Sequence, residues 1–287
     1  FIAFAIKAPM VPVHTWLPDA AEQATPGAST LLVGLLDKIG TLGMIRICLG
    51  LFPQASQWAT PFVLVLAVIS VLWGATMAVT SKDLMRLVSY TSVSHFGFMI
   101  IGIFAVTTTS LTGSIFYMFN HGFSTAALFL VLGFLVKRRG SAQVDAFGGV
   151  QKTAPVLAGM FLFAGLATMS LPGISNFIGE FMVLAGAWSR HPVYVAVATL
   201  GMVLGAVYIL LTYKRTMTGP LTQATKAHVT TDLTGLEKAA LTPLVILLLV
   251  FGFFPRPMLH VIEPVAHQTM SIVGVTDPAP AAEEGVK

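Results

Sequence analysis

The chain has 287 residues, of which 55% are hydrophobic and only 10% are charged, against roughly 25% charged residues in an ordinary globular protein. A mean hydropathy of +0.84 leaves too little polar surface for a soluble particle, so the sequence predicts a polytopic membrane protein. The single cysteine, Cys48, excludes disulfide frameworks and cysteine-rich metal clusters within the chain. The net charge of +4 fits membrane orientation better than nucleic-acid binding, because most of the 16 Lys and Arg residues lie between apolar runs.

Long apolar runs predict the membrane-spanning elements in chain order. A bilayer crossing needs about 20 apolar residues, and such runs must be helical because lipid offers no partners for free backbone groups. The run from 1 to 12 is an incomplete first span without an initiating Met, so we expect the chain to be a fragment of a longer protein. Seven full spans follow, at 28–50, 61–80, 87–107, 110–136, 153–187, 193–213 and 238–254. The predicted fold class is therefore an all-α membrane protein.

The connecting loops alternate in charge. Ten Lys and Arg residues lie in loops on one side and three on the other, so the positive-inside rule places the ten in the cytoplasm and the C-terminus outside. Residues 1–254 then form the membrane domain and 255–287 an extracytoplasmic tail, whose Pro- and Glu-rich end at 277–287 we expect to be disordered. The ten are Lys82, Arg86, Lys137, Arg138, Arg139, Lys152, Lys214, Arg215, Lys226 and Lys238, and the three are Arg190, Arg256 and Lys287.

Two of the spans are expected to be broken helices. At about 1.5 Å per residue, 153–187 would reach about 50 Å, which is too long for one crossing. Pro172 and Gly173 stand near its centre, where they favour an interruption. The first span also ends in prolines, directly after Lys7. Interrupted helices beside ionisable residues are typical of transporter sites, whereas the alternative is a proline kink whose freed carbonyls are covered by neighbouring helices.

Five ionisable residues form a series deep within the predicted spans: Lys7, Lys38, His95, His121 and Glu180. Arg46 sits near a helix end, where it can reach the headgroups, and receives no role. A charge at the bilayer centre costs at least about 2.5–3.5 kcal/mol, so such groups face the protein interior or water. Lysine can lose its proton when desolvated, and histidine titrates near neutral pH. A row of these groups at similar depth predicts proton transfer along the membrane. For His95 a hydrogen-bonded packing role is an equal alternative, and Glu180 could instead neutralise a lysine.

Other polar residues receive weaker interpretations. Asp37 precedes Lys38, but adjacent helical residues point apart, so Asp37 is not its obvious partner. His14, Asp19 and Glu22 fall at the predicted cytoplasmic edge, where solvation is expected and a role in proton uptake is the alternative.

Five segments resemble the motifs of the proton-translocating, antiporter-like subunits of respiratory complex I, in the order in which that family carries them. The resemblance covers nearly the whole chain up to about residue 254, and it implies a fourteen-helix fold of two inverted repeats with both termini outside. On this alignment the chain starts inside the seventh helix. The segments are FAIKAPMVPVHTWLPDA (4–20), LLDKIG (35–40), SYTSVSHFG (89–97), FNHG (119–122) and GISNFIGEF (173–181).

The resemblance implies roles for individual residues. Lys7 matches the family's central lysine, Lys38 its connecting lysine, His121 the histidine of the eleventh helix, and Glu180 the terminal ionisable group of the twelfth. A glutamate at the last position resembles the M subunit (chain 4), since the L and N relatives and the sodium/proton antiporters typically carry lysine there. The family's glutamate partner of Lys7 would lie upstream of the first residue.

Two segments depart from the family pattern. Residues 21–26 lack the usual histidine and glutamate, which puts the function of that loop in question. Asp37 stands where relatives commonly carry an apolar residue.

The function implied by the resemblance is proton translocation in the membrane arm of a bacterial NADH:quinone oxidoreductase, in the plasma membrane. We expect neighbouring L-like and N-like subunits as partners. We expect no cofactor in this chain, with NADH, FMN, iron–sulfur clusters and quinone bound by other subunits. One alternative is a subunit of a sodium/proton antiporter or a membrane-bound hydrogenase. Another is a structural membrane spacer that does not conduct.

Overall fold

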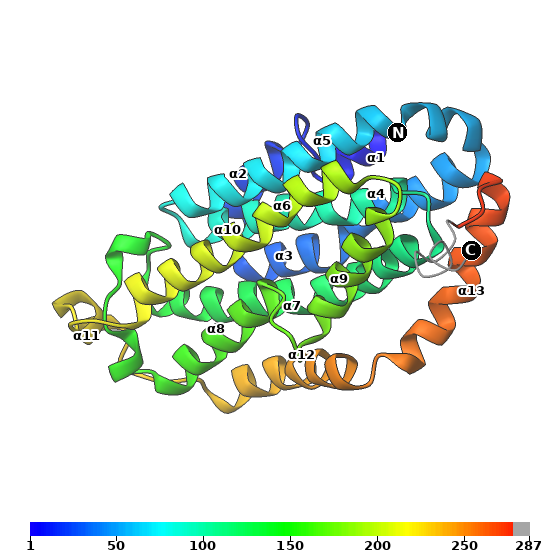
Figure 1. Cartoon of the computed structure of the whole chain (residues 1–287). Helices are drawn as coiled ribbons and strands as arrows, with labels where there is room; N and C mark the ends of the chain where they lie inside the picture. The colour runs from blue at the N-terminus through cyan, green and yellow to red at the C-terminus, as the bar shows by residue number, and fades with distance from the viewer. Residues whose placement is uncertain (278–287) are drawn as a thin grey trace.

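Long helices run side by side in an elongated bundle (Figure 1). The structure, a computed structural model, describes residues 1–277, and within that range every regular element is helical, as the sequence predicts. Five of these helices are long and apolar enough to cross a membrane. They are α5 (Pro53–Thr80), α6 (Leu84–Phe104), α7 (Thr108–Arg139), α10 (Pro192–Met217) and α12 (Gly235–Phe253).

Helix α6 forms the centre of the bundle, where it packs against α5 and α7. Every residue of α6 except Arg86 is buried, although the helix contains several hydroxyl side chains. These hydroxyls bond to backbone carbonyls, as when Ser89 donates to the Met85 carbonyl at 2.9 Å and Ser94 to the Val71 carbonyl of α5 at 2.9 Å. Because their polar groups are satisfied, they can be buried at little cost. The helix thereby holds His95 in the middle of the protein.

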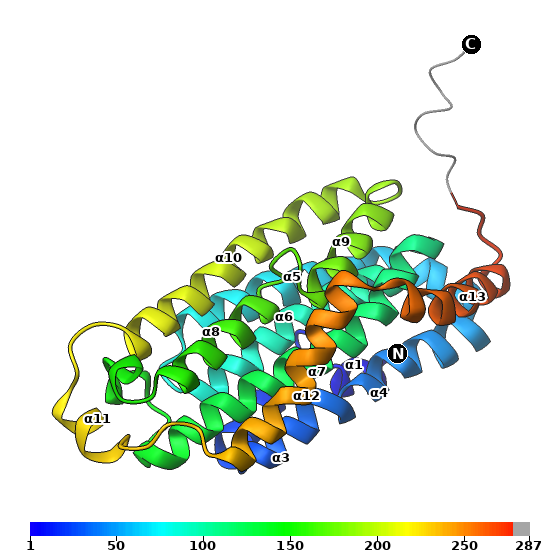
Figure 2. The same cartoon turned by 90° about the horizontal axis from the view of Figure 1, so that it is seen from below.

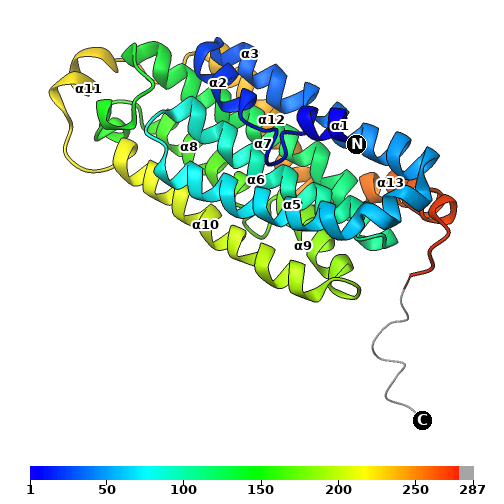
Figure 3. The same cartoon turned by 90° about the horizontal axis from the view of Figure 1, so that it is seen from above.

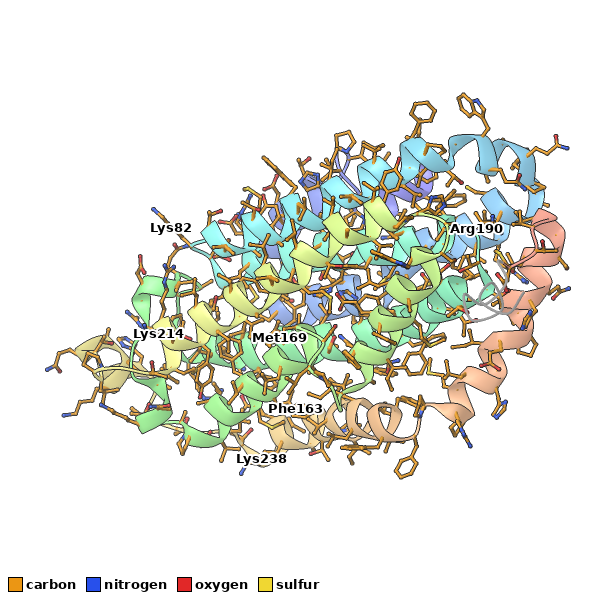
Figure 4. The ribbon with its side chains drawn as sticks, viewed as in Figure 1. Lys82, Phe163, Met169, Arg190, Lys214 and Lys238 are labelled. Carbon is orange, nitrogen blue, oxygen red and sulfur yellow. The ribbon has the colours of Figure 1, made fainter. Side chains whose placement is uncertain are left out.

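The predicted break in span 153–187 is confirmed. Helix α8 (Pro155–Thr168) and helix α9 (Ser175–Trp188) are separated by a connection at 169–174, and Met169 of that connection lies mid-way along the bundle (Figure 4). The backbone takes left-handed dihedrals at Gly173 (φ 95°) and at Ser170 (φ 57°). This conformation is easy for glycine and uncommon for serine, so the surrounding structure must hold Ser170 in place.

The first span is interrupted as well. Helix α1 (Ile2–Lys7) ends at the predicted position and is followed by turns and by α2 (Trp16–Gln23). The indole N–H of Trp16 donates to the Ile6 carbonyl at 2.8 Å and ties the two short helices together. The connection between the first two predicted spans thus contains the short helix α2, whose eight residues with a proline among them give too short a periodic pattern to recognise.

Span 28–50 is one continuous helical run, but it contains two π-helical segments. It consists of α3 (Pro26–Leu31), the π-helical η1 (Leu32–Leu36), α4 (Lys38–Gly43) and the π-helical η2 (Met44–Leu49). Single-turn π segments are rare and occur frequently at functional sites. Here the first π segment ends directly before Asp37 and Lys38.

The cationic loops gather at one end of the bundle, as the charge alternation predicts. Lys82 and Lys214 lie at one end and Arg190 towards the other (Figure 4). The short helices η3 (Val144–Ala146), η4 (Val150–Lys152) and α11 (Gln223–His228) belong to the cationic end.

The segment predicted as a tail begins with a helix, α13 (Arg256–Val273), which packs at the opposite end of the bundle (Figure 2). Of the stretch predicted to be disordered, only Asp277 is described, and its carboxylate accepts the Thr108 backbone N–H at 2.8 Å. Residues 278–287 lie outside the described part.

Glycines let α9 approach α7 closely. A Cβ atom at Gly186 would lie 2.4 Å from the backbone nitrogen of Ser110, and one at Gly179 would lie 2.7 Å from Tyr117 Cβ. Because backbone atoms cannot step aside, Gly186→Ala is expected to lower the free energy of unfolding by about 1–3 kcal/mol. The midpoint of thermal unfolding in detergent measures the change.

The matched control for that substitution is Gly159→Ala on α8, where a Cβ atom meets nothing within 4 Å. This variant is expected to be neutral or slightly stabilising, by roughly 0.5–1 kcal/mol, since alanine favours a helix over glycine. Equal midpoints for the two variants would contradict the close crossing of α7 and α9.

Candidate functional site

Lys7 and Asp37 form an ion pair at the end of α1, with 3.7 Å between Lys7 Nζ and Asp37 Oδ1. The pair lies at the predicted interruption of the first span and beside the first π segment, since α1 ends at Lys7 and Asp37 joins that π segment to α4. Asp37 is fully buried, whereas the side chain of Lys7 is 36% exposed. The prediction that Asp37 is not the obvious partner of Lys38 agrees with this ion pair, but the pairing of Asp37 with Lys7 was not predicted.

Lys38 contacts His121 directly. Its Nζ lies 2.9 Å from His121 Nδ1, and it also donates to the Val33 carbonyl within the first π segment. The contact requires the two backbones to be close, and a Cβ atom at Gly122 would lie 2.7 Å from the carbonyl oxygen of Gly34. Since an ammonium can only donate, a charged Lys38 makes Nδ1 of His121 the acceptor.

The two buried histidines face one another. Their ring centroids are 5.2 Å apart, and His121 is fully buried while His95 is 4% exposed. Nε2 of His121 lies 3.1 Å from Thr125 Oγ1, one helical turn further along α7. A neutral His121 that accepts at Nδ1 carries its proton on Nε2 and donates it to Thr125.

A hydrogen-bonded chain continues from His95 to Glu180. Nδ1 of His95 lies 2.5 Å from the Tyr117 hydroxyl oxygen, and that hydroxyl donates to Glu180 Oε2 at 3.2 Å. Because Tyr117 has a single proton and gives it to the carboxylate, it must accept from His95 Nδ1–H. The other ring nitrogen of His95 then accepts from the Tyr208 hydroxyl, 3.3 Å away.

The break between α8 and α9 completes the environment of Glu180. The left-handed backbone at Ser170 turns its hydroxyl to donate to Glu180 Oε2. Glu180 is 2% exposed, so this oxygen accepts two hydrogen bonds in a dry interior. Such bonds favour the charged carboxylate and offset part of the cost of burying it.

The structure thus brings four of the five predicted site residues, Lys38, His121, His95 and Glu180, into one buried series. The fifth, Lys7, forms an ion pair with Asp37 instead. The series runs Lys38–His121, then His95, then Tyr117 and Glu180. Sequence reasoning missed four hydroxyl or carboxyl partners. Tyr117 could have been found because it lies four residues before His121 on the same helical face, whereas Tyr208 and Ser170 carry no such signal. The missed residues are Asp37, Tyr117, Ser170 and Tyr208.

The predicted cytoplasmic edge holds a second polar cluster. A guanidinium N–H of Arg86 donates to Asp19 Oδ1 at 2.6 Å and to Glu22 Oε2 at 2.7 Å. These carboxylates are therefore paired rather than simply solvated, and a cavity of about 300 Å³ opens beside them. Asp83 caps α6 there, and burial raises the pKa of its carboxyl against the opposing effect of the Arg86 and Met85 N–H donors. His14 is buried, with an Nδ1 that has no hydrogen-bond partner among the described residues.

Comparison with known proteins shows to which family the chain belongs. Residues 1–205 match the model of the family described as NADH:quinone oxidoreductase/Mrp antiporter, TM. The chain belongs to this family. The resemblance drawn from the five motifs is therefore confirmed, and the chain is a multi-pass membrane protein of the antiporter-like kind.

Individual members of the family give more detail. The chain is 49% identical over 284 residues to the NADH-quinone oxidoreductase subunit M of Mycobacterium tuberculosis, with 99% of this chain and 51% of that protein covered. It is 41% identical over 261 residues to the subunit M of Rickettsia prowazekii, covering 91% and 53% of the two chains. The chain therefore spans about half the length of the curated relatives it matches.

Two solved structures share the fold. A chain of respiratory complex I from Thermus thermophilus with bound NADH superposes with a TM-score of 0.87 at 32% identity, covering 96% of this chain and 58% of that one. A chain of the Mrp complex from Dietzia superposes with a TM-score of 0.85 at 22% identity, covering 95% and 60%. The predicted all-α antiporter-like architecture is confirmed by these likenesses.

Proposed function

We propose that the chain translocates protons as part of a membrane-arm subunit of a bacterial NADH:quinone oxidoreductase. The subunit names of the curated relatives support the assignment to that complex. Redox chemistry would take place elsewhere, with NADH, FMN, iron–sulfur clusters and quinone bound by other subunits. Within the complex, this chain would act as a translocase that carries protons but no electrons.

The observation that carries the proposal is the directed hydrogen-bond chain from His95 through Tyr117 to Glu180. A proton delivered to Nε2 of His95 makes an imidazolium. The Nδ1–H bond then breaks as an O–H bond forms on Tyr117, while the original Tyr117 proton moves to the Glu180 carboxylate. The products are a neutral His95 and a neutral Glu180, so no charge is left unbalanced in the interior.

The preceding step in this proposal joins Lys38 to the histidines. The Lys38 ammonium gives a proton to His121 Nδ1 across the 2.9 Å contact. The resulting imidazolium carries its other N–H on Nε2 against Thr125 Oγ1, and transfer to the facing His95 ring requires that N–H to turn away from Thr125. A series of short transfers of this kind moves a proton through the bundle without moving a helix.

The orientation and surroundings follow as part of the same proposal. The cationic loops would face the cytoplasm of a bacterial cell and α13 the outside, with the protein in the plasma membrane. Neighbouring L-like and N-like antiporter subunits would be its partners. Protons would be taken up from the cytoplasm and leave outward by way of Glu180.

The Lys38→Ala variant tests this function in the full-length protein within its complex. We expect proton uptake into inverted vesicles through this subunit to slow by roughly 10²–10⁴-fold, because a proton-transfer group has been removed. Lys226→Ala, which removes an exposed lysine of α11, is the control and should pump normally. Normal pumping by an assembled Lys38→Ala complex would reject the proposal.

The sodium dependence of proton flux distinguishes the proposed function from its nearest alternative, a sodium/proton antiporter. The likeness to the Mrp chain supports a shared fold only, since the identity is 22%. Proton flux that depends on sodium and proceeds without NADH oxidation would favour an antiporter. A structural spacer predicts instead that neutralising the buried series leaves pumping unchanged, although a spacer gains nothing from burying Lys38, His121 and Glu180 at several kcal/mol of desolvation each.

A further inference from the structure

Asp37 is the most poorly satisfied acidic side chain in the described part of the chain. Its exposure is 0%, and neither carboxylate oxygen has a hydrogen-bond partner among residues 1–277. Among these residues, the one group within ion-pair distance is the Lys7 ammonium, whose Nζ lies 3.7 Å from Oδ1. A buried carboxylate with so little support is costly, so the fold maintains Asp37 only through its pairing with Lys7 or by protonating it.

The packing of α1 against α4 fixes this geometry. A Cβ atom at Gly40 would lie 2.4 Å from the Ala8 nitrogen and 2.7 Å from the Phe4 carbonyl oxygen, so the two helices touch at this glycine. Figure 3 shows the dark-blue α1 beside the blue helical run that begins with α3. Asp37 lies three residues before Gly40 and therefore shares its face of the helical run. That face meets α1 just where α1 ends at Lys7.

The next residue points the other way. Lys38 extends to the Val33 carbonyl and to His121 on α7, on the side of the run away from α1. Of these two consecutive residues, Asp37 therefore pairs with α1 and Lys38 contacts α7. Because adjacent residues are only about 3.8 Å apart at their Cα atoms, the charge of Asp37 acts on Lys38 through a dry region in which charges interact strongly. The titratable groups that face Asp37 are Lys7 on α1, Lys38 on its own run and, through Lys38, His121 on α7.

We propose that Asp37 is a titrating counter-ion of Lys7 that controls release of the proton held by Lys38. The inference rests on the proposed proton translocation and adds to it a carboxylate acting on the Lys38 step. In one state Lys7 is an ammonium and Asp37 a carboxylate, which stabilises the Lys38 ammonium. In the other state an N–H bond of Lys7 has broken and an O–H bond on Asp37 has formed, so both groups are neutral.

Loss of the Asp37 charge removes the attraction that held the Lys38 proton, and that proton moves to His121 Nδ1. The reverse transfer restores the Lys7 ammonium and the Asp37 carboxylate, and Lys38 takes up the next proton. The transfer between Lys7 and Asp37 needs no oxidant or reductant. It requires the 3.7 Å separation to shorten to a charge-assisted hydrogen bond of about 2.8 Å.

The test is Asp37→Asn in the full-length protein within its complex, with Asp37→Glu as the conservative variant and exposed Asp145→Asn as the matched control. We expect Asp37→Asn to lower NADH-driven proton uptake per NADH oxidised about tenfold and to change its pH profile, because the amide cannot titrate. Asp37→Glu should retain most of the uptake, and Asp145→Asn should match the parent. A pH jump should give a protonated-carboxyl stretching band in infrared difference spectra that Asp37→Asn lacks.

Uptake and a pH profile equal to the parent in an assembled Asp37→Asn complex would overturn the role of Asp37. The Lys38→Ala variant in the same preparation separates the two hypotheses. If Lys38→Ala loses uptake while Asp37→Asn does not, only the inference about Asp37 fails. If Lys38→Ala also pumps normally, proton translocation along this series fails with it.

Discussion

Glu180→Ala is expected to abolish proton translocation through this chain while the complex still assembles. Glu180 is the acceptor at the end of the hydrogen-bond chain, and the Tyr117 and Ser170 hydroxyls both donate to its Oε2 atom. Without the carboxylate, a proton that reaches Tyr117 has no base to receive it, and the two donors are left unsatisfied in a dry interior. The measurement is the ratio of protons translocated to NADH oxidised in inverted vesicles.

Three further variants make the Glu180 experiment specific. Glu180→Gln keeps the side-chain volume but cannot bind a proton at neutral pH, so it should fail like alanine. Glu180→Asp keeps the carboxyl group and should retain part of the flux. Glu263→Gln removes an exposed carboxylate of α13 and should leave the ratio unchanged. Translocation by the glutamine variant at the parental ratio would rule out a proton-carrying role for this carboxyl.

Tyr117→Phe is expected to slow translocation by roughly 10²–10⁴-fold, which is the usual contribution of a positioned proton donor and acceptor. The ring stays in place, but the hydroxyl that joins His95 Nδ1 to Glu180 is lost. No other described side chain bonds to both of these groups. The rate of proton uptake at saturating NADH measures the effect.

The control for this variant is Tyr213→Phe on α10, whose ring packs against Phe161. It removes the same atom and should leave uptake unchanged. A Tyr117→Phe complex that pumps at the parental rate would show that water, and not the tyrosine hydroxyl, joins His95 to Glu180. In that event the proton path through these residues would have to be redrawn.

Apolar length and charge alternation were enough to predict most of the fold. The spans, their order, the break at Pro172–Gly173 and the gathering of cations at one end all follow from the cost of exposing polar groups to lipid. The π segments at Leu32–Leu36 and Met44–Leu49 did not follow, because the hydrophobic pattern of a π turn hardly differs from that of an α turn. Helix α2 was missed because it is too short for its period to be recognised.

The sequence predicted how deep in the membrane the site residues lie, but not which neighbours their side chains face. The position of Lys38, His121 and Glu180 along their spans placed them at similar heights, and the structure brings them into one series. Depth along a helix does not say which neighbour a side chain faces, so the hydroxyl partners remained hidden. Asp37 illustrates the limit, since helix geometry indicated that Lys38 is not its obvious partner, yet only the crossing of α1 and α4 at Gly40 directs its side chain to Lys7.

The single hydrogen on the Tyr117 oxygen gives the proposed path a polarity. Once one proton has passed, the hydroxyl points back towards the imidazole, and Glu180 must discharge before the bond can swing round again. Translocation would therefore proceed as alternating hop and turn, one particle at a time. Heavy water would slow both halves of such a cycle, because the hop and the turn each move a hydrogen.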